Sequence, residues 1–440
     1  MKVLTRRLPR LLLALATSFI LFLFFFNSKN GSLPSYGGLL DVRHNSLLLF
    51  NYSTPEAPAI PNAPPSCTSK KSIIFIKTHK SGSTTLIATF QKYAYLNGLS
   101  MMVPNVENNM FNWPMEFRPN IDNVKNVQDE RFDMLVNHII FNKTSIAPLM
   151  SPEAQYVTIL RDPLAHLSSS FRYFDVNANG RLGLGVEGFK RFLTDPAKYD
   201  ATPYWMKNVL PLSRNRINSL TRNLQAADLG LSYWDFDKPR IVDEFMNRTM
   251  KTLQFVVILE RIDESLVLLR RHMCWRMQDI IFISKNVNPT RLLKMNDYPG
   301  WARINAYKWN NVDLLLYQAA NRRLDDLRSS ANGLDDEVAA YRTIQRQVTK
   351  YCNGLLREPG QHKSTLTIKA GRWNEGFLVD SKFCVLLLLD ERDLTHVFKC
   401  KQHPEHKDCQ EKSGYRAKMM LSMIEGEIEY KQILMTPRTS

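Results

Sequence analysis

Short apolar runs that end abruptly in polar residues recur between residues 73 and 259. They are Ile73–Ile76, Phe132–Ile139 (FDMLVNHI), Tyr156–Leu160 and Phe255–Leu259. Runs of this kind need apolar cover on both faces, which is typical of strands inside a parallel sheet. Leu86, Phe90 and Tyr93 follow the first run at helical spacing. Another amphipathic helix begins at about Asp263. The pattern predicts an α/β fold, with a central parallel sheet and helices on both faces.

An uncharged apolar run, Leu11–Phe26, follows basic residues at positions 2, 6, 7 and 10. As a helix it covers roughly 24 Å, enough for a thin early-secretory bilayer with help from its flanks. The basic flank predicts a cytosolic N-terminus and hence a type II signal-anchor. A cleaved signal peptide is the alternative, but the run ends in three phenylalanines and NSKNGS, without a small-x-small cleavage site.

The composition changes along the chain in a way that suggests five segments. We expect a cytosolic tail (1–10), a transmembrane helix (11–26), a stem rich in Pro, Ser, Asn and Gly (27–71), a catalytic domain (72–325) and a C-terminal extension (326–440). The extension is more charged and less regular than the domain before it, and the sequence does not define its role.

Two features agree with a lumenal catalytic domain. Glycan acceptor triplets begin at Asn51, Asn142 and Asn247. The chain also has six cysteines, which can form up to three disulfides in an oxidising lumen, with the pairing left open.

The net charge of +16 and the isoelectric point near 9.5 favour an anionic partner. No zinc-finger, RNA-recognition or leucine-zipper pattern accompanies this charge, so we expect no nucleic-acid partner. The sequence does not indicate an oligomeric state.

The segment after the first predicted strand has the makings of an anion-binding loop. Lys77, His79 and Lys80 lead into Ser81-Gly82-Ser83-Thr84-Thr85, and a helix follows. A strand, loop and helix in this order direct backbone N–H groups and the positive end of a helix dipole at one point. The nucleotide P-loop needs a further glycine four residues before a Gly-Lys pair, so a nucleotide kinase is disfavoured.

A second polar turn follows the strand at Tyr156–Leu160. Arg161 lies where that strand ends, and Ser169 stands eight residues later. At the carboxyl edge of a parallel sheet a guanidinium can bind a phosphate with two hydrogen bonds, and a hydroxyl can complete the shell.

These two segments resemble the donor-binding motifs of sulfotransferases. Lys80–Thr84 resembles the 5′-phosphosulfate loop, and Arg161-Asp162-Pro163 with Ser169 resembles the 3′-phosphate motif. Within that superfamily the chain resembles the galactose-3-O-sulfotransferases from about Cys67 to Asn321, through the segments KTHK (77–80), VNH (136–138), RDPLAHLSSSFRYF (161–174), DESLVLLRRHMCW (263–275) and WNNVDLLLYQAAN (309–321).

The resemblance implies a P-loop-like sulfotransferase fold and a Golgi membrane enzyme. Its donor would be 3′-phosphoadenosine 5′-phosphosulfate (PAPS), released as PAP, and no metal would be required. The acceptor would be the 3-hydroxyl of a terminal β-galactose, on a galactosylceramide-like glycolipid or on a glycoprotein glycan. The donor-binding residues would be Lys77, Lys80, Ser81, Gly82, Ser83, Thr84, Thr85, Arg161 and Ser169.

The reaction needs a cation at the leaving group and a base at the acceptor hydroxyl. Lys80 suits the first role, and Lys77 and His79 can hold sulfate oxygens or the leaving group. We expect His138 to be the base because it follows a predicted strand and would project from the same sheet edge as the loop. His79 is the alternative base. The structural alternative for His138 is a core histidine with no part in catalysis.

Two alternative functions stay open. The enzyme could sulfate heparan or chondroitin chains, or the chain could be a non-catalytic Golgi carbohydrate-binding protein. A compact galactose pocket would need aromatic side chains, for which Trp113, Trp301 and Trp309 are available.

The segment Cys400–Cys409 (CKQHPEHKDC) could suggest zinc, but its spacing is unusual for a zinc site, and a Cys400–Cys409 disulfide is expected instead.

Overall fold

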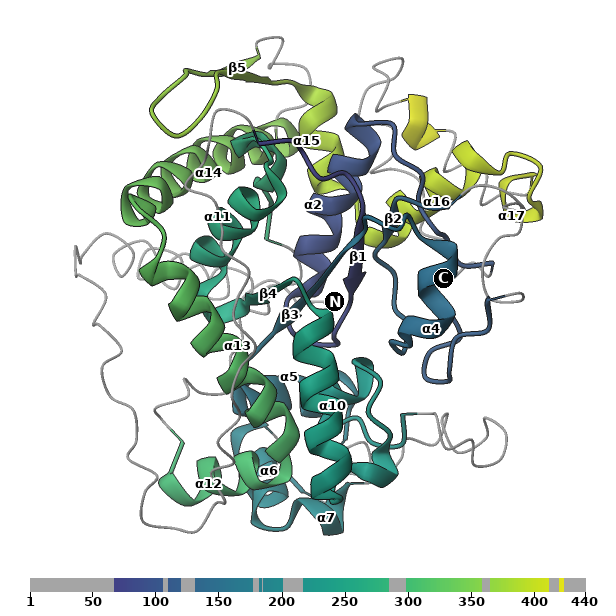
Figure 1. Cartoon of the computed structure of the whole chain (residues 1–440), viewed down its shortest axis with the longest axis vertical. Coiled ribbons are helices and arrows are strands. Elements are labelled where there is room, and N and C mark those ends of the chain that lie inside the picture. Colours follow the sequence, from purple (N-terminus) through teal and green to yellow (C-terminus); the bar gives the residue numbers. More distant parts are fainter. Residues whose placement is uncertain are drawn as a thin grey trace, which may run out of the picture. The chain divides into compact units, whose positions relative to one another are not determined.

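A four-stranded parallel sheet lies at the centre of the chain (Figure 1). The structure is a computed structural model and describes residues 67–105, 110–119, 131–176, 182–183, 185–200, 217–284, 298–357, 365–410 and 419–422. The strand order is β2-β1-β3-β4, with β1 at Ile73–Ile76, β2 at Met134–Leu135, β3 at Gln155–Leu160 and β4 at Phe255–Ile258. The predicted α/β architecture is confirmed.

Three of the predicted strands agree with the structure to within one residue at each end, and the fourth is much shorter. β1, β3 and β4 are buried almost throughout, as their apolar runs require. The run at 132–139 pairs as a strand only over Met134–Leu135. Beyond it, His138 forms an isolated parallel bridge with Met110.

The helices connect the strands and cover the sheet. They are α2 (Ser83–Leu96), α4 (Lys143–Ile146), α5 (Pro163–Tyr173), α6 (Gly185–Thr194), α7 (Pro196–Tyr199), α9 (Leu224–Asp228), α10 (Pro239–Thr252), α11 (Ile262–Met273), α12 (Gly300–Trp309), α13 (Asn311–Ser329), α14 (Leu334–Arg357), α15 (Ser381–Leu388), α16 (Glu391–Gln402) and α17 (Lys407–Gln410). A small antiparallel pair, β5 (Leu366–Ile368) and β6 (Phe377–Val379), precedes α15.

Helices from the C-terminal region pack directly on the core. α15 and α16 contact α2, while α14 contacts both α11 and α15 (Figure 1). The expected boundary between residues 325 and 326 falls inside α13, and the described residues on both sides of it belong to one compact unit.

Three disulfides join these elements. Cys67 pairs with Cys274, Cys352 with Cys384, and Cys400 with Cys409. The last pair confirms the expected disulfide. Cys352–Cys384 links α14 to α15, and Cys67–Cys274 links the residues before β1 to the end of α11.

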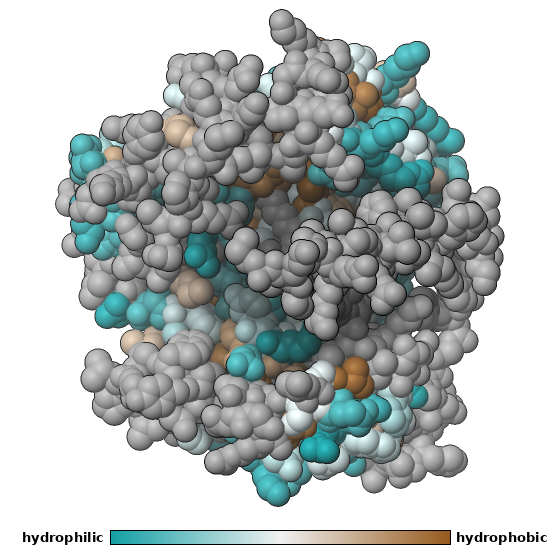
Figure 2. All heavy atoms as spheres, turned by 180° about the vertical axis from the view of Figure 1, so that it is seen from behind, coloured by the Kyte–Doolittle hydropathy of each residue, from teal (hydrophilic) through white to brown (hydrophobic). Residues whose placement is uncertain are grey.

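The predicted anchor at 11–26 and the stem up to residue 66 lie outside the described residues. Within the described ranges, none of the helices combines the length and the apolar character needed to cross a bilayer. On the face seen in Figure 2, the hydrophobic residues that are visible lie in small groups between hydrophilic ones.

Candidate active site

The turn after β1 has the backbone shape expected of an anion-binding loop. Lys80 has φ of 53° and Gly82 has φ of 81°, both in the left-handed region. The positive φ at Gly82 favours glycine, and a Cβ atom there would lie 2.6 Å from Leu259 Cδ1, so the leucine side chain would have to shift. Gly82 is the N-cap of α2, makes no side-chain cap, and is followed by a first turn without acidic residues. The N-terminal amides of α2 are therefore placed to meet an anion.

The hydroxyl groups of the loop divide into two sets. Thr78 Oγ1 donates to Ile159 O at 2.5 Å, and the hydroxyls of Ser81 and Ser83 donate to Thr78 O at 2.9 and 2.8 Å. All three side chains are buried. Thr78 thus holds the loop onto β3, and Ser81 and Ser83 close the loop on itself. Thr84 is half-buried in the first turn of α2. Thr85 is buried one residue further on.

Lys80 and Arg161 are brought together across neighbouring strands. Arg161 Nη1 donates to Lys80 O at 2.9 Å. Gln225 fixes the backbone of Arg161, since it accepts from Arg161 N at 2.8 Å and donates to Arg161 O at 3.0 Å. The ammonium of Lys80 lies 3.5 Å from the centre of the Tyr173 ring. Ser169 is half-buried on α5, the helix that begins two residues after Arg161.

Positive charge is concentrated at this point. Burial, and then the charges of Arg161, Lys77 and Arg172, lowers the pKa of Lys80 to about 8. Mutual repulsion among cations is relieved when an anion binds between them. The residues therefore suit a ligand with several negative charges.

Two buried histidines lie face to face beside the loop. The rings of His79 and His138 are stacked with centroids 3.8 Å apart, and Trp113 lies 4.1 Å from His79 on centroids. Asp228 accepts from the backbone N–H of His79 at 2.7 Å and contacts its Nδ1 at 2.9 Å. Trp113 Nε1 donates to the same carboxylate at 3.1 Å. In the neutral ring, Nδ1–H then points at Asp228 and Nε2 keeps its lone pair.

His166 fixes His79 from the other side. Its Nε2 lies 2.8 Å from His79 O, and a carbonyl only accepts, so Nε2 carries the proton. Burial lowers the pKa of His166 to about 3, which keeps this ring neutral. Backbone donor and acceptor of His79 are thus both held in place.

His138 has fewer partners than His79. Its Nδ1 is buried without a hydrogen-bond partner among the described residues. Burial, followed by the charges of His79, Lys77 and Lys80, lowers the pKa of His138 well below its ordinary value. The ring is therefore neutral near pH 7.

Lys77 is buried in an ion pair that the sequence did not reveal. Its Nζ lies 2.5 and 2.6 Å from the two carboxylate oxygens of Glu391, at the start of α16. Burial lowers the pKa of Lys77, and Glu391 opposes this effect.

The sequence motifs identified the residues that lie near one another along the chain and missed their partners. Asp228, Gln225 and Glu391 stand far from the motifs in sequence, in segments that carry no recognisable pattern. Of the three candidate tryptophans, Trp113 packs against His79, and Trp301 is exposed on α12. The ring centre of Trp309 lies 5.0 Å from the guanidinium carbon of Arg222.

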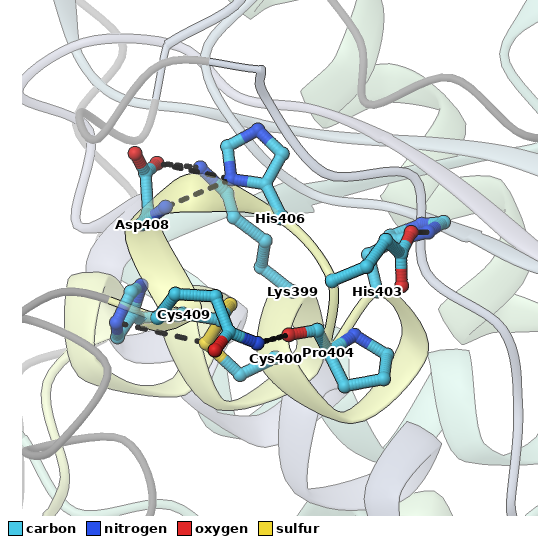
Figure 3. The surroundings of a disulfide bond; sticks show 10 residues. Lys399, Cys400, His403, Pro404, His406, Asp408 and Cys409 are labelled. Atoms are coloured by element: carbon cyan, nitrogen blue, oxygen red, sulfur yellow. Dashed lines mark hydrogen bonds and ion pairs between the residues drawn. A yellow bond between two sulfur atoms is a disulfide. The ribbon is translucent and has the colours of Figure 1, made fainter.

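The segment Cys400–Cys409 closes a short loop at the end of α16 (Figure 3). His406 lies 3.6 Å from Asp408, which also accepts from Lys399 at 2.9 Å. Within the described ranges, no group of three or more His, Cys, Asp and Glu side chains is arranged to hold a metal ion. The disulfide takes up the two cysteines that a zinc site would use.

Comparison with known proteins agrees with the site. The profile of the family Galactose-3-O-sulfotransferase matches residues 3–368. Galactosylceramide sulfotransferase of Bos taurus is 31% identical over 354 residues, which cover 77% of each chain. Galactose-3-O-sulfotransferase 2 of Mus musculus is 28% identical over 298 residues, covering 65% of this chain and 70% of its own. No solved structure matches the chain. The match along most of its length shows that the chain belongs to the galactose-3-O-sulfotransferase family.

Proposed function

We propose that this enzyme transfers the sulfuryl group of PAPS to the 3-hydroxyl of a terminal β-galactose. The observation that carries the proposal is the stacked pair His79–His138, held by Asp228 next to the cationic loop at Lys80. A base beside an anion cradle is what sulfuryl transfer to a hydroxyl requires. The names of the relatives, galactosylceramide sulfotransferase and galactose-3-O-sulfotransferase, support galactose as the acceptor.

The donor would be held by the loop and by the cations next to it. The N-terminal amides of α2, together with Thr84, would meet the 5′-phosphate, while Arg161 and Ser169 would bind the 3′-phosphate. Ser81, Gly82 and Ser83 would contribute by giving the loop its shape, and Thr85 would take part from the first turn of α2. Lys80 would lie at the bridging oxygen and stabilise the charge that grows there as the phosphate departs.

The contacts favour His79 over His138 as the base. Asp228 orients Nδ1–H of His79 and leaves Nε2 to accept a proton, the arrangement found wherever a carboxylate supports a catalytic histidine. His79 would take the hydroxyl proton as the acceptor oxygen bonds to sulfur and the bond from sulfur to the bridging oxygen breaks. His138, whose ring is neutral, would stack on His79 and contact the acceptor.

Fold and location belong to the same proposal. A parallel sheet with an anion loop after β1 is compatible with a P-loop-like sulfotransferase fold. The apolar run at 11–26 would anchor the enzyme in the Golgi membrane as a single-pass type II protein, with its catalytic domain in the lumen.

Labelled PAPS and a panel of galactosides test the activity directly. The purified lumenal region is expected to label galactosylceramide or a galactose-terminated glycan at the 3-hydroxyl. His79→Ala and Asp228→Asn should lower kcat by about 10²–10⁴-fold, the usual contribution of a positioned base, and leave PAP affinity within twofold. His138→Ala should have the smaller effect on kcat.

The variants also define what would contradict the proposal. Collapse of kcat in His138→Ala with normal turnover in His79→Ala would transfer the base role to His138. Labelling of heparan or chondroitin in place of galactosides would favour a glycosaminoglycan sulfotransferase. PAP binding or glycan binding without any transfer would indicate a carbohydrate-binding protein.

A further inference from the structure

The first two turns of α16 reach both loops that carry the active-site histidines. Glu391 binds Lys77, two residues before His79, through both carboxylate oxygens. Thr395, one turn later on the same helix, accepts from Asn137 Nδ2 at 3.0 Å, and Asn137 directly precedes His138. One helix face therefore touches the chain next to each member of the stacked pair.

The hydroxyl of Thr395 is fully used. It donates to Glu391 O at 2.8 Å and accepts from Asn137 and from Gln91 on α2, each at 3.0 Å. A hydroxyl has one donor and two acceptor sites, so no capacity is left. Gln91 also donates to Glu391 O at 3.3 Å, so the hydrogen-bond network includes α2, the helix that begins at the loop after β1.

All of these groups are buried. Lys77 and Glu391 are 4% and 5% exposed in their side chains, and Asn137 and Gln91 are inaccessible to solvent. The amide oxygens of Asn137 and Gln91 have no partner among the described residues, so the Thr395 hydroxyl is the group that pairs the amide nitrogens of both. Loss of that hydroxyl would leave buried donors unpaired, which is costly, and this favours a defined geometry. The network can thus fix the positions of two loops more strictly than apolar packing would.

We propose that Glu391 and Thr395 are positioning residues of the active site, which keep the loops of His79 and His138 in stacking register. This inference rests on the proposed function. The two residues lie beyond residue 368, where the family profile ends. In this chain the C-terminal region therefore supports a site whose histidines and donor-binding residues come from the first half of the sequence.

Thr395→Val and Thr395→Ser form a matched pair that tests the inference. Valine has the shape of threonine without the hydroxyl, so the loop at Asn137 loses its anchor, while serine keeps the oxygen. We expect Thr395→Val to lower kcat per folded molecule by tenfold or more, since small displacements of reacting groups are costly. PAP affinity should stay within twofold, and Thr395→Ser should restore most of kcat.

Glu391→Gln is a second, independent test, because it weakens the ion pair with Lys77. Gln402→Met is the control. Gln402 lies in the last turn of α16, and among the described residues its side chain hydrogen-bonds to the backbone of Met101, at 2.8 and 2.9 Å. Both variants remove polar contacts of the same helix. Glu391→Gln should lower kcat by tenfold or more, whereas Gln402→Met should lower the melting temperature alone.

NMR signals of selectively labelled histidines separate this inference from the proposed function. Thr395→Val should move the ring signals of His138 and shift its titration, and Thr395→Ser should not. Normal kcat per folded molecule and unmoved histidine signals in Thr395→Val and Glu391→Gln would overturn the inference. A wild-type chain that fails to bind PAP would overturn the proposed function, and the histidine signals would still decide whether the helix positions the pair.

Discussion

The ammonium group of Lys80 is subject to two opposing effects. Burial and the cations around it lower its pKa to about 8, while a bound phosphate favours its charged form. Below that pH the free enzyme carries the ammonium, and we expect it to bind PAP well. Above it the proton is lost, so PAP affinity should fall as the pH rises through about 8. Titration calorimetry on both sides of this pH measures the effect.

Arginine at the same position tests the assignment. The guanidinium of Lys80→Arg stays protonated, so its PAP affinity should lose the decline near pH 8. Lys251→Arg, an exposed substitution on α10, is the control and should keep the wild-type profile. Identical pH dependence in the wild type and in Lys80→Arg would mean that another group causes the decline. Lys80→Ala should weaken PAP binding roughly ten- to a hundredfold, the loss of one charge-assisted hydrogen bond.

Residues of the candidate site differ in how well sequence reasoning finds them. Lys80, Arg161 and both histidines stand directly after apolar runs, and the carboxyl edge of a parallel sheet collects whatever follows its strands. Asp228 lies at the end of the short helix α9, in a segment without a motif. Only folding brings it to His79, across 149 positions of the chain. A local pattern carries no information about such a contact.

The strands also differ in how well the sequence predicts them. β1, β3 and β4 were predictable because strands buried on both faces have continuous apolar runs. β2 ends early because the residues after Leu135 have other partners: Asn137 binds Thr395, and His138 O accepts from Phe111 N at 2.7 Å. The polar residues Asn137 and His138 therefore mark the end of the strand and the start of the candidate site.

The link between α14 and α15 allows a prediction about stability. Cys352–Cys384 closes a loop of 32 residues, which corresponds to about 3–4 kcal/mol in the chain-entropy estimate. Cys400–Cys409, with a separation of 9, corresponds to about 2–3 kcal/mol. Replacing both cysteines of the first pair by alanine should lower the melting temperature by several degrees, and by more than the same change in the second pair. Calorimetry that gives the reverse order would show that packing outweighs loop closure here.

At the scale of the whole molecule, the C-terminal region packs on the elements around the sheet. The ion pair Lys77–Glu391 and the contacts of α15 and α16 with α2 tie it to the loop after β1, and the Cys352–Cys384 disulfide fastens α14 to α15 within that region. The sequence indicated only that this region is charged and irregular. Its position depends on pairs separated by about three hundred residues, such as Lys77 and Glu391, which no periodicity reveals.

The proposed membrane topology leads to a prediction about which asparagines carry glycans. With basic residues before the apolar run at 11–26, everything after it should enter the lumen. Asn247 is exposed on α10, so among the described residues its side chain is accessible to a glycan. Asn142 instead caps α4 by accepting from Thr144 N and donates through its amide to Glu116 at 3.1 Å. We expect Asn247 to be the more fully modified of the two.

Gel mobility after endoglycosidase treatment of the full-length chain checks this expectation. The wild type should shift, Asn247→Gln should shift less, and Asn142→Gln should differ little from the wild type. Because Asn247 is exposed, its substitution should leave folding intact, so a smaller shift reports the loss of a glycan. If treatment changes nothing and Asn51, Asn142 and Asn247 are all unmodified by mass spectrometry, the catalytic domain faces the cytosol. A Golgi enzyme acting on lumenal galactose would then be ruled out, because its donor site and its acceptor would lie on opposite sides of the membrane.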